Sequence, residues 1–216
     1  YHRVGLFSKT QAIVNNIIVY CETNGNAVSE VSLELLTKAR SLAAELDVQV
    51  EAILIGSDLK GLEKELNLHG AQVVHKAEDP RLDFYQTLPH TRIVTAIFEK
   101  EKPQIGLLGA TPVGRDLAPR IASALKCGLT ADCTSLEIGE HHDKKLDKTY
   151  KNLLYQIRPA FGGNIVATII NPETRPQLAT VREGVMKREA LSAPVKGSVK
   201  TWKVEEILSD KDFVVE

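Results

Sequence analysis

Two patterns of hydrophobic residues follow one another along the chain. In the first half, strand-like segments rich in β-branched and aliphatic residues at 17–20, 48–55, 71–75 and 105–108 alternate with segments whose apolar residues recur every three or four positions, and the run at 17–20 is continuous. A continuous apolar run is typical of a strand buried on both faces, and the longer spacing is typical of an amphipathic helix. Because such alternation requires crossover connections, we predict a parallel sheet with helices on both faces.

Three helices are predicted between these strands. The first begins after the candidate cap Ser29, and a short second helix covers residues 59–66. The third begins at Thr87 or near Pro89 and ends before Pro103. These boundaries rest on capping chemistry, on apolar spacing and on the inability of proline to continue a helix.

The second half of the chain is rich in short β-type runs. Four of them, at 133–138, 151–157, 165–170 and 178–181, have no helical segment between them and are separated by polar or Gly/Pro turns. Strands joined by short turns pair antiparallel. We therefore predict an antiparallel β extension to the parallel sheet.

Metal ligands are sparse in this sequence. The charged loop at 140–148 contains His141 and His142, but no third ligand stands beside them, and Cys127 and Cys133 have no companion His or Cys pair. A structural metal site normally needs three or four ligands. We interpret the loop as a solvated hairpin tip and the cysteines as buried thiols, and we expect no metal.

The stretch from Gly109 to Arg120, with the sequence GATPVGRDLAPR, carries the strongest local signal. It follows the run at 105–108 and has the chemistry of a tight loop that leads into a helix. Thr111 can cap the helix, Pro112 suits its first position, and Gly114 permits a close backbone approach. Loops at the carboxyl ends of parallel strands are where α/β sheets place ligands or partners.

Three motifs together carry a family resemblance. They are GATPVGRDLAPR at 109–120, RPAFGGN at 158–164 and RPQLATVR at 175–182. In this order they resemble the amino-terminal domain of the α subunit of electron transfer flavoproteins, with similarity from about residue 16 to 187, and the last two are similar to the versions in anaerobes. The resemblance implies an α/β, Rossmann-like fold of the adenine nucleotide alpha hydrolase type.

The resemblance also implies a function. A complete α subunit pairs with a β subunit, and FAD is held mainly by a C-terminal domain whose Gly-rich and Gln-His motifs are not found before Glu216. Electrons pass from a dehydrogenase or NADH toward a quinone reductase, ferredoxin or acyl-CoA dehydrogenase. We therefore expect an electron carrier fragment, not an enzyme, with no FAD bound to this chain alone.

The expected organisation has three parts. Residues 1–15 form an extension, residues 16–190 form the α/β domain, and residues 191–216 form a tail that leads toward the FAD-binding domain. The domain serves as scaffold and subunit interface. The interface or loop candidates lie in the three motifs and are Thr111, Gly114, Arg115, Asp116, Arg158, Phe161, Gly162, Gly163, Asn164 and Arg182.

Alternatives stay open at several of these positions. Arg115 lies against the helix dipole and should have a specific partner, which is an anion, a carboxylate of the β subunit, the flavin-bearing domain or an intramolecular acid. Phe161 is an interface anchor or part of a small satellite core. Pro119 removes a backbone donor inside the helix, so we predict that the helix bends or restarts near residues 115–119.

Composition narrows the class of protein further. A net charge of −1 and a 5% aromatic content argue against nucleic-acid binding, and no apolar run is long enough for membrane insertion. Three cysteines without a disulfide framework favour a cytoplasmic setting. The alternative function is a stand-alone adenine-nucleotide-binding or hydrolysing protein of the same fold. Its loops would be 21–26 and 111–115, although the common phosphate fingerprints are missing.

Overall fold

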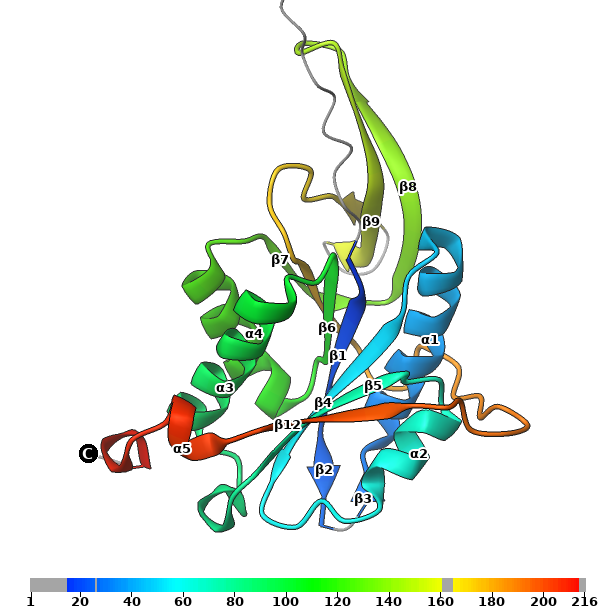
Figure 1. The fold of residues 1–216 in the computed structure, drawn as a ribbon. Helices are drawn as coiled ribbons and strands as arrows, with labels where there is room; N and C mark the ends of the chain where they lie inside the picture. The colour runs from blue at the N-terminus through cyan, green and yellow to red at the C-terminus, as the bar shows by residue number, and fades with distance from the viewer. Residues whose placement is uncertain (1–14, 26, 161–164, 214–216) are drawn as a thin grey trace, which may run out of the picture.

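The computed structural model describes residues 15–213 except Asn26 and residues 161–164. Its centre is a parallel sheet of seven strands in the order β12-β5-β4-β1-β6-β11-β7 (Figure 1). In chain order these are β1 (Ile17–Cys21), β4 (Val50–Gly56), β5 (Val73–Glu78), β6 (Ile105–Gly109), β7 (Leu129–Cys133), β11 (Gln177–Val181) and β12 (Ser198–Trp202). The predicted parallel sheet is confirmed.

Helices cover both faces of this sheet. They are α1 (Glu30–Leu46), α2 (Leu62–Leu68), α3 (Thr87–Glu101), α4 (Pro112–Leu125) and the short α5 (Val204–Ile207). Alternate residues of β1 point to opposite faces: Ile17 and Val19 join the core beneath α1 and α2, whereas Ile18 and Tyr20 join the core beneath α3 and α4. This is the arrangement that a continuously apolar strand predicts.

Short elements complete the connections. A small hairpin of β2 (Thr23–Asn24) and β3 (Ala27–Val28) follows β1, and 3-10 turns occupy Pro80–Leu82 and Asp210–Phe213. The second helix begins at Leu62, three residues later than the start predicted from Leu59, and Leu59 is buried in the preceding loop. No helix among the described residues is long and apolar enough to cross a membrane.

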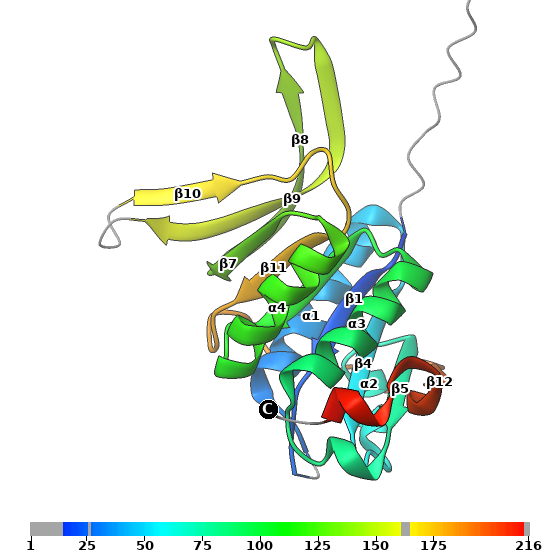
Figure 2. The same ribbon diagram turned by 90° about the vertical axis from the view of Figure 1, so that its left-hand side faces the viewer.

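A second sheet of three antiparallel strands extends away from the central sheet (Figure 2). It consists of β8 (Ser135–Asp143), β9 (Lys148–Ala160) and β10 (Ile165–Ile169), in the order β10-β9-β8. Its base is continuous with the main core, because Leu136 and Leu154 are fully buried in the cluster that also holds α1. The exposed turn between β8 and β9 confirms the predicted hairpin tip.

The predicted extension was too large at one end. The run at 178–181 is not antiparallel: as β11 it lies between β6 and β7 in the parallel sheet, and Gln177–Val181 is buried throughout. Residue 133 ends the parallel strand β7, and the antiparallel strand begins only at Ser135. The physical reason is that β11 pairs with a strand distant in sequence, which a local turn pattern does not reveal.

We predicted that the helix bends or restarts near Pro119; the restart is wrong, and the bend stays a prediction. Helix α4 runs without interruption through Pro119. The proline is exposed, so water can satisfy the carbonyl of Arg115 that loses its helical partner. The buried residues Leu117 and Ile121 hold the turns on both sides of Pro119 against the sheet.

Candidate functional site

The candidate site lies at the carboxyl edge of the parallel sheet. From β1 the chain passes through α1 to β4 on one side, and it later returns through α3 to β6 on the other side. The strand order therefore reverses between β1 and β6. In open α/β sheets, the crevice outside the strand ends at such a reversal is the usual place for a ligand or partner.

Thr111 connects the two loops at this reversal. Its hydroxyl oxygen accepts the backbone N–H of Gly114 at 2.9 Å, which confirms the predicted cap of α4. The same hydroxyl donates to Oε1 of Glu22 at 2.7 Å, and Glu22 follows β1. Burial raises the pKa of Glu22, the hydrogen bond from Thr111 opposes this shift, and the nearby carboxylate of Glu183 adds to it.

Gly114 allows the first turn of α4 to touch β6. A Cβ at this position would collide with the carbonyl oxygen of Gly109 at the end of that strand. The backbone approach expected for Gly114 is therefore present. It sets the position of the helix N-terminus relative to the strand.

Asp116 joins α4 to the beginning of α3. Its Oδ2 accepts hydrogen bonds from the hydroxyls of Tyr85 at 2.7 Å and Thr87 at 2.8 Å, and its Oδ1 accepts one from Arg120 at 3.1 Å. The hydrogen bond from Tyr85 is the largest influence that lowers the pKa of Asp116. These contacts give Asp116 a structural role between two helices.

Arg115 has an intramolecular partner. Its Nε donates to the carbonyl oxygen of Ala110 at 2.8 Å, and its Nη2 lies 3.3 Å from Oδ1 of Asp132. Asp132 also forms an ion pair with Arg182, whose Nη2 lies 2.6 Å from Oδ2 of Asp132. Arg182 lowers the pKa of Asp132 most, and the charges of Arg115 and Arg158 lower it further.

Residues from all three sequence motifs therefore meet around one carboxylate. Arg115, of the first motif, follows the helix cap Thr111. Arg158, of the second motif, lies on β9, and Arg182, of the third motif, follows β11. We call these three side chains and Asp132 the arginine cluster. The side chains of Arg115 and Arg182 are 58% and 49% exposed, so their ion pairs with Asp132 lie at an accessible surface, and the charge of Arg158 also acts on this acid. Phe161, Gly162, Gly163 and Asn164 lie outside the described residues.

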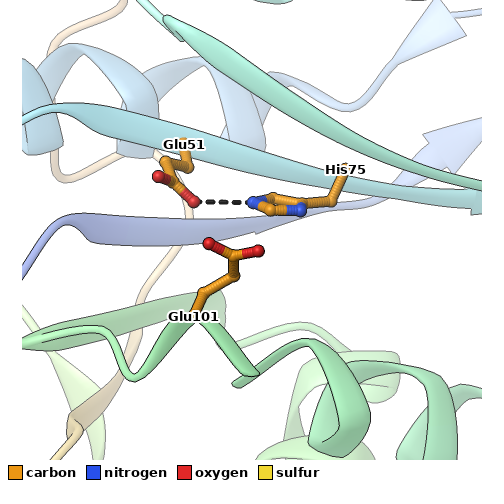
Figure 3. Close-up of side chains that lie close together, drawn as sticks. All are labelled: Glu51, His75 and Glu101. Carbon is orange, nitrogen blue, oxygen red and sulfur yellow. Dashed lines mark hydrogen bonds and ion pairs between the residues drawn. The ribbon is translucent and has the colours of Figure 1, made fainter. Parts of the chain in front are cut away.

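A polar network at the other end of the strand order, around β4, β5 and β12, escaped the sequence-based prediction (Figure 3). His75 on β5 lies with its Nε2 2.6 Å from Oε2 of Glu51 on β4, and its Nδ1 accepts the indole N–H of Trp202 at 3.0 Å. Because Nδ1 accepts, the ring proton is on Nε2 and is donated to Glu51. Glu101 completes the group and is paired with Lys200 at 2.9 Å.

This network holds the strand β12 in place. Burial alone raises the pKa of Glu51, but hydrogen bonds from His75 and Asn16 lower it below its ordinary value. Glu51, His75 and Glu101 are the one group of three candidate metal ligands within the described part of the chain. Both nitrogens of His75 already have hydrogen-bond partners, and Lys200 supplies a cation. A sequence signal existed, since Glu51 and His75 are titratable residues within segments that the pattern predicts to be strands of the central sheet.

The buried thiols expected from the sequence are found for Cys133 but only in part for Cys127. Cys21 and Cys133 are buried and Cys127 is half-buried, and none forms a disulfide. Burial raises the pKa of the Cys133 thiol to about 12, so the thiol is protonated and unreactive at neutral pH. His142 lies 3.6 Å from Asp147 at the exposed tip between β8 and β9.

Comparisons with known proteins agree on one family. The family model described as "Electron transfer flavoprotein domain" matches residues 17–207. The electron transfer flavoprotein subunit alpha of Megasphaera elsdenii is 44% identical over 198 residues, which is 92% of this chain and 55% of the relative. The same subunit of Thermoanaerobacterium thermosaccharolyticum is 44% identical over 173 residues, which is 80% of this chain and 49% of the relative.

A third relative is a subunit with a more specific name. The LctC subunit of the lactate dehydrogenase (NAD(+),ferredoxin) of Acetobacterium woodii is 41% identical over 172 residues, which is 80% of this chain and 39% of the relative. The chain thus spans about half the length, or less, of these relatives.

Proposed function

This chain belongs to the electron transfer flavoprotein family, and from that premise we propose that it provides the scaffold and subunit-interface domain of an α subunit. In this proposal residues 16–190 form the domain, and residues 191–216 lead toward a C-terminal domain that holds FAD. The complete protein is a cytoplasmic electron carrier that pairs with a β subunit. The name of the relative LctC supports NADH and ferredoxin among the redox partners.

The arginine cluster is the observation that carries the interface assignment. Arg115 and Arg182 form ion pairs with Asp132, and the charge of Arg158 on β9 acts on the same carboxylate, so among the described residues three arginines share one acid. Arginine is enriched in the energetically important centres of interfaces because it forms several directed hydrogen bonds. A carboxylate on the β subunit would neutralise part of the positive charge that Asp132 leaves unpaired.

The outer strand of the same sheet offers an apolar contact. On β10, Ile165 and Val166 are 55% and 65% exposed, and among the strands that the structure describes β10 pairs with β9 alone. An exposed apolar edge strand usually needs a partner to cover it. The antiparallel sheet therefore combines apolar and cationic surface near one another, as interface centres do.

The test uses the complete α subunit co-expressed with its β subunit. Val166→Asp on β10 is expected to weaken β-subunit binding at least about tenfold, because a charge would be desolvated in the interface. Val199→Asp is the matched control, since Val199 is a 48% exposed valine on β12, an edge strand of the central sheet. Titration calorimetry measures the affinity of each variant, and thermal unfolding shows whether it is folded.

A second variant addresses the motif residues directly. Arg158→Ala combined with Phe161→Ala is expected to weaken β-subunit binding while the melting temperature stays nearly unchanged. A clear fall in melting temperature with retained β-subunit affinity would assign this segment to the core of the domain. If the Val166→Asp variant and the wild type bind the β subunit with equal affinity, β10 is not part of the interface.

A further inference from the structure

Two large apolar side chains are exposed close together where α3 begins. Phe84, in the loop before this helix, is 77% exposed, and Leu88 in its first turn is 52% exposed. Phe84 is the most exposed large hydrophobic side chain in the part of the chain that the structure describes. Because Leu88 follows Phe84 by four residues, their Cα atoms lie at most about 14 Å apart. We call these two side chains the Phe84–Leu88 patch.

The neighbours of Phe84 hold it at the surface. On one side Leu82 is buried in the core, and on the other side the hydroxyl of Tyr85 is hydrogen-bonded to α4 at 2.7 Å. Asp83 is also fixed, since its Oδ1 accepts the hydroxyl of Ser57 at 2.6 Å. With both flanks anchored, the ring of Phe84 stays in contact with water unless another part of the protein covers it. Covering it is favourable, because apolar area then leaves water.

The end of the described chain lies beside this patch. Its 3-10 turn packs against α3 and against the loop before α3, and two arginines carry the contacts. Nη1 of Arg81 lies 2.8 Å from Oδ1 of Asp210, and the guanidinium carbon of Arg81 is 4.2 Å from the centre of the Phe213 ring. Nη1 of Arg92 lies 2.8 Å from Oδ1 of Asp212. These contacts fix the place at which residue 213 leaves the domain.

Both arginines flank the patch. Arg81 precedes Phe84 by three residues, and Arg92 follows Leu88 by four residues within α3. Side chains four residues apart lie on the same face of a helix. Leu88 therefore lies on the face of α3 that Arg92 and Asp212 share. A chain that continues beyond residue 213 starts its path next to the patch.

The small size of the patch argues for an occupant on the same chain. A stable interface with a separate protein buries about 800 Å² on each partner, whereas one large side chain contributes at most about 250 Å². A domain joined to the same chain needs much less contact area, because a short connection gives it a roughly millimolar effective concentration. The curated relatives are about twice as long as the part of them that this chain matches, so their length leaves room for such a domain.

We propose that the Phe84–Leu88 patch is the surface on which the C-terminal domain of the complete α subunit docks, an inference that rests on the proposed function. The face of that domain that meets the patch is apolar, because the two arginines beside the patch are already paired within this chain. Docking buries Phe84 and Leu88 and restricts the positions that the domain takes relative to the parallel sheet. The β subunit is the competing occupant.

Amide hydrogen exchange measured by mass spectrometry tests this docking. The samples are the 216-residue chain and the complete α subunit in complex with its β subunit. The first N–H groups of a helix have no intrahelical partner, so the amides at the start of α3 exchange rapidly unless another surface covers them. In the complete complex, exchange at residues 83–90 is expected to be at least about tenfold slower than in the 216-residue chain.

Variants of the complete complex identify what covers the patch. Phe84→Asp combined with Leu88→Asp is expected to restore rapid exchange at residues 83–90, because docking would desolvate the new charges. Aspartate suits the first turn of a helix, so Leu88→Asp should fold. The double variant should keep FAD and bind the β subunit within about twofold of the wild-type affinity, as measured by titration calorimetry. Leu146→Asp, at a 65% exposed leucine between β8 and β9, is the control and should leave the exchange unchanged.

The outcomes separate this inference from the proposed function. A complex that holds FAD and the β subunit, but exchanges at residues 83–90 as rapidly as the 216-residue chain, overturns the docking surface alone. A double variant that is folded by circular dichroism and loses about tenfold or more of its β-subunit affinity also overturns it, because the β subunit then covers the patch. A complete protein that holds no FAD or does not pair with a β subunit overturns the proposed function, and this inference with it.

Discussion

At the residue scale, the contact between Gly114 and Gly109 determines how α4 meets β6. The space at Gly114 is filled by a backbone carbonyl, which cannot rotate away as a side chain can. A methyl group there requires the helix to move. Thr111, which caps the same helix and binds Glu22, would move with it.

We expect Gly114→Ala to lower the free energy of unfolding by at least about 2 kcal/mol, because the added methyl group overpacks a rigid contact. The control is Ser123→Ala, an exposed position on the same helix, which should stay within about 0.5 kcal/mol of the wild type. Urea unfolding measures both. A stable Gly114→Ala chain would mean that the helix shifts at little cost.

His90 makes the stability of the chain depend on pH. Its folded pKa is about 4, whereas a histidine in an unfolded chain titrates near about 6.5. As pH falls through this interval, the unfolded state takes up a proton and the folded state does not. The free energy of unfolding therefore decreases between about pH 6.5 and 4, by on the order of 3 kcal/mol.

His90→Asn tests this effect, because the asparagine side chain can still form a hydrogen bond with the backbone of Gln86 but does not titrate. We expect the variant to lose less stability than the wild type over the same pH interval. His141→Asn at the exposed hairpin tip should follow the wild type. Parallel pH curves for the wild type and His90→Asn would contradict the assignment.

At the scale of elements, Pro119 lies in the interior of α4 and yet does not interrupt it. The lost hydrogen bond and the ring clash still have an energetic cost. We expect Pro119→Ala to raise the free energy of unfolding by about 1–3 kcal/mol. Pro112→Ala at the first position of the same helix should have little effect, because proline is well suited there. Denaturant unfolding of both variants is the measurement, and no gain from Pro119→Ala would show that the helix already relieves the strain.

The edge strand β12 is attached through polar contacts as well as backbone pairing. Trp202→Phe keeps an aromatic ring but removes the N–H that His75 accepts. We expect a loss of about 1–3 kcal/mol, because Nδ1 of buried His75 then has no partner. Val199→Ala on the exposed side of β12 is the control and should change stability far less. Unfolding should be followed by circular dichroism and not by tryptophan fluorescence, because the variant removes the only tryptophan of the chain. Equal stabilities of the variant and the wild type would mean that water replaces the hydrogen bond of the indole.

At the scale of the whole molecule, we proposed that FAD is held by a C-terminal domain and not by this chain. We expect the isolated chain to purify without stoichiometric FAD, because its loops contain no fingerprint for a dinucleotide. A complete α subunit co-expressed with its β subunit should be yellow. Absorbance near the flavin bands measures both, and a yellow isolated chain would refute the proposed location of FAD.

The sequence by itself determined the class of the fold and most of the parallel sheet. Runs such as 17–20 and 105–108 are apolar on every residue, and only strands covered on both faces bury all of them. The helix cap at Thr111 could also be predicted from the sequence, because capping depends on residues only three positions apart. The three motifs identified the family, and the comparisons confirmed it.

The tertiary structure alone decided which distant residues meet. Strand β11 joins the parallel sheet because its partners β6 and β7 come from far earlier in the chain. The arginine cluster and the network of Glu51, His75 and Trp202 likewise join residues separated by many positions. Periodicity and capping report on neighbours along the chain, whereas strand order and buried polar pairing depend on the three-dimensional path of the backbone.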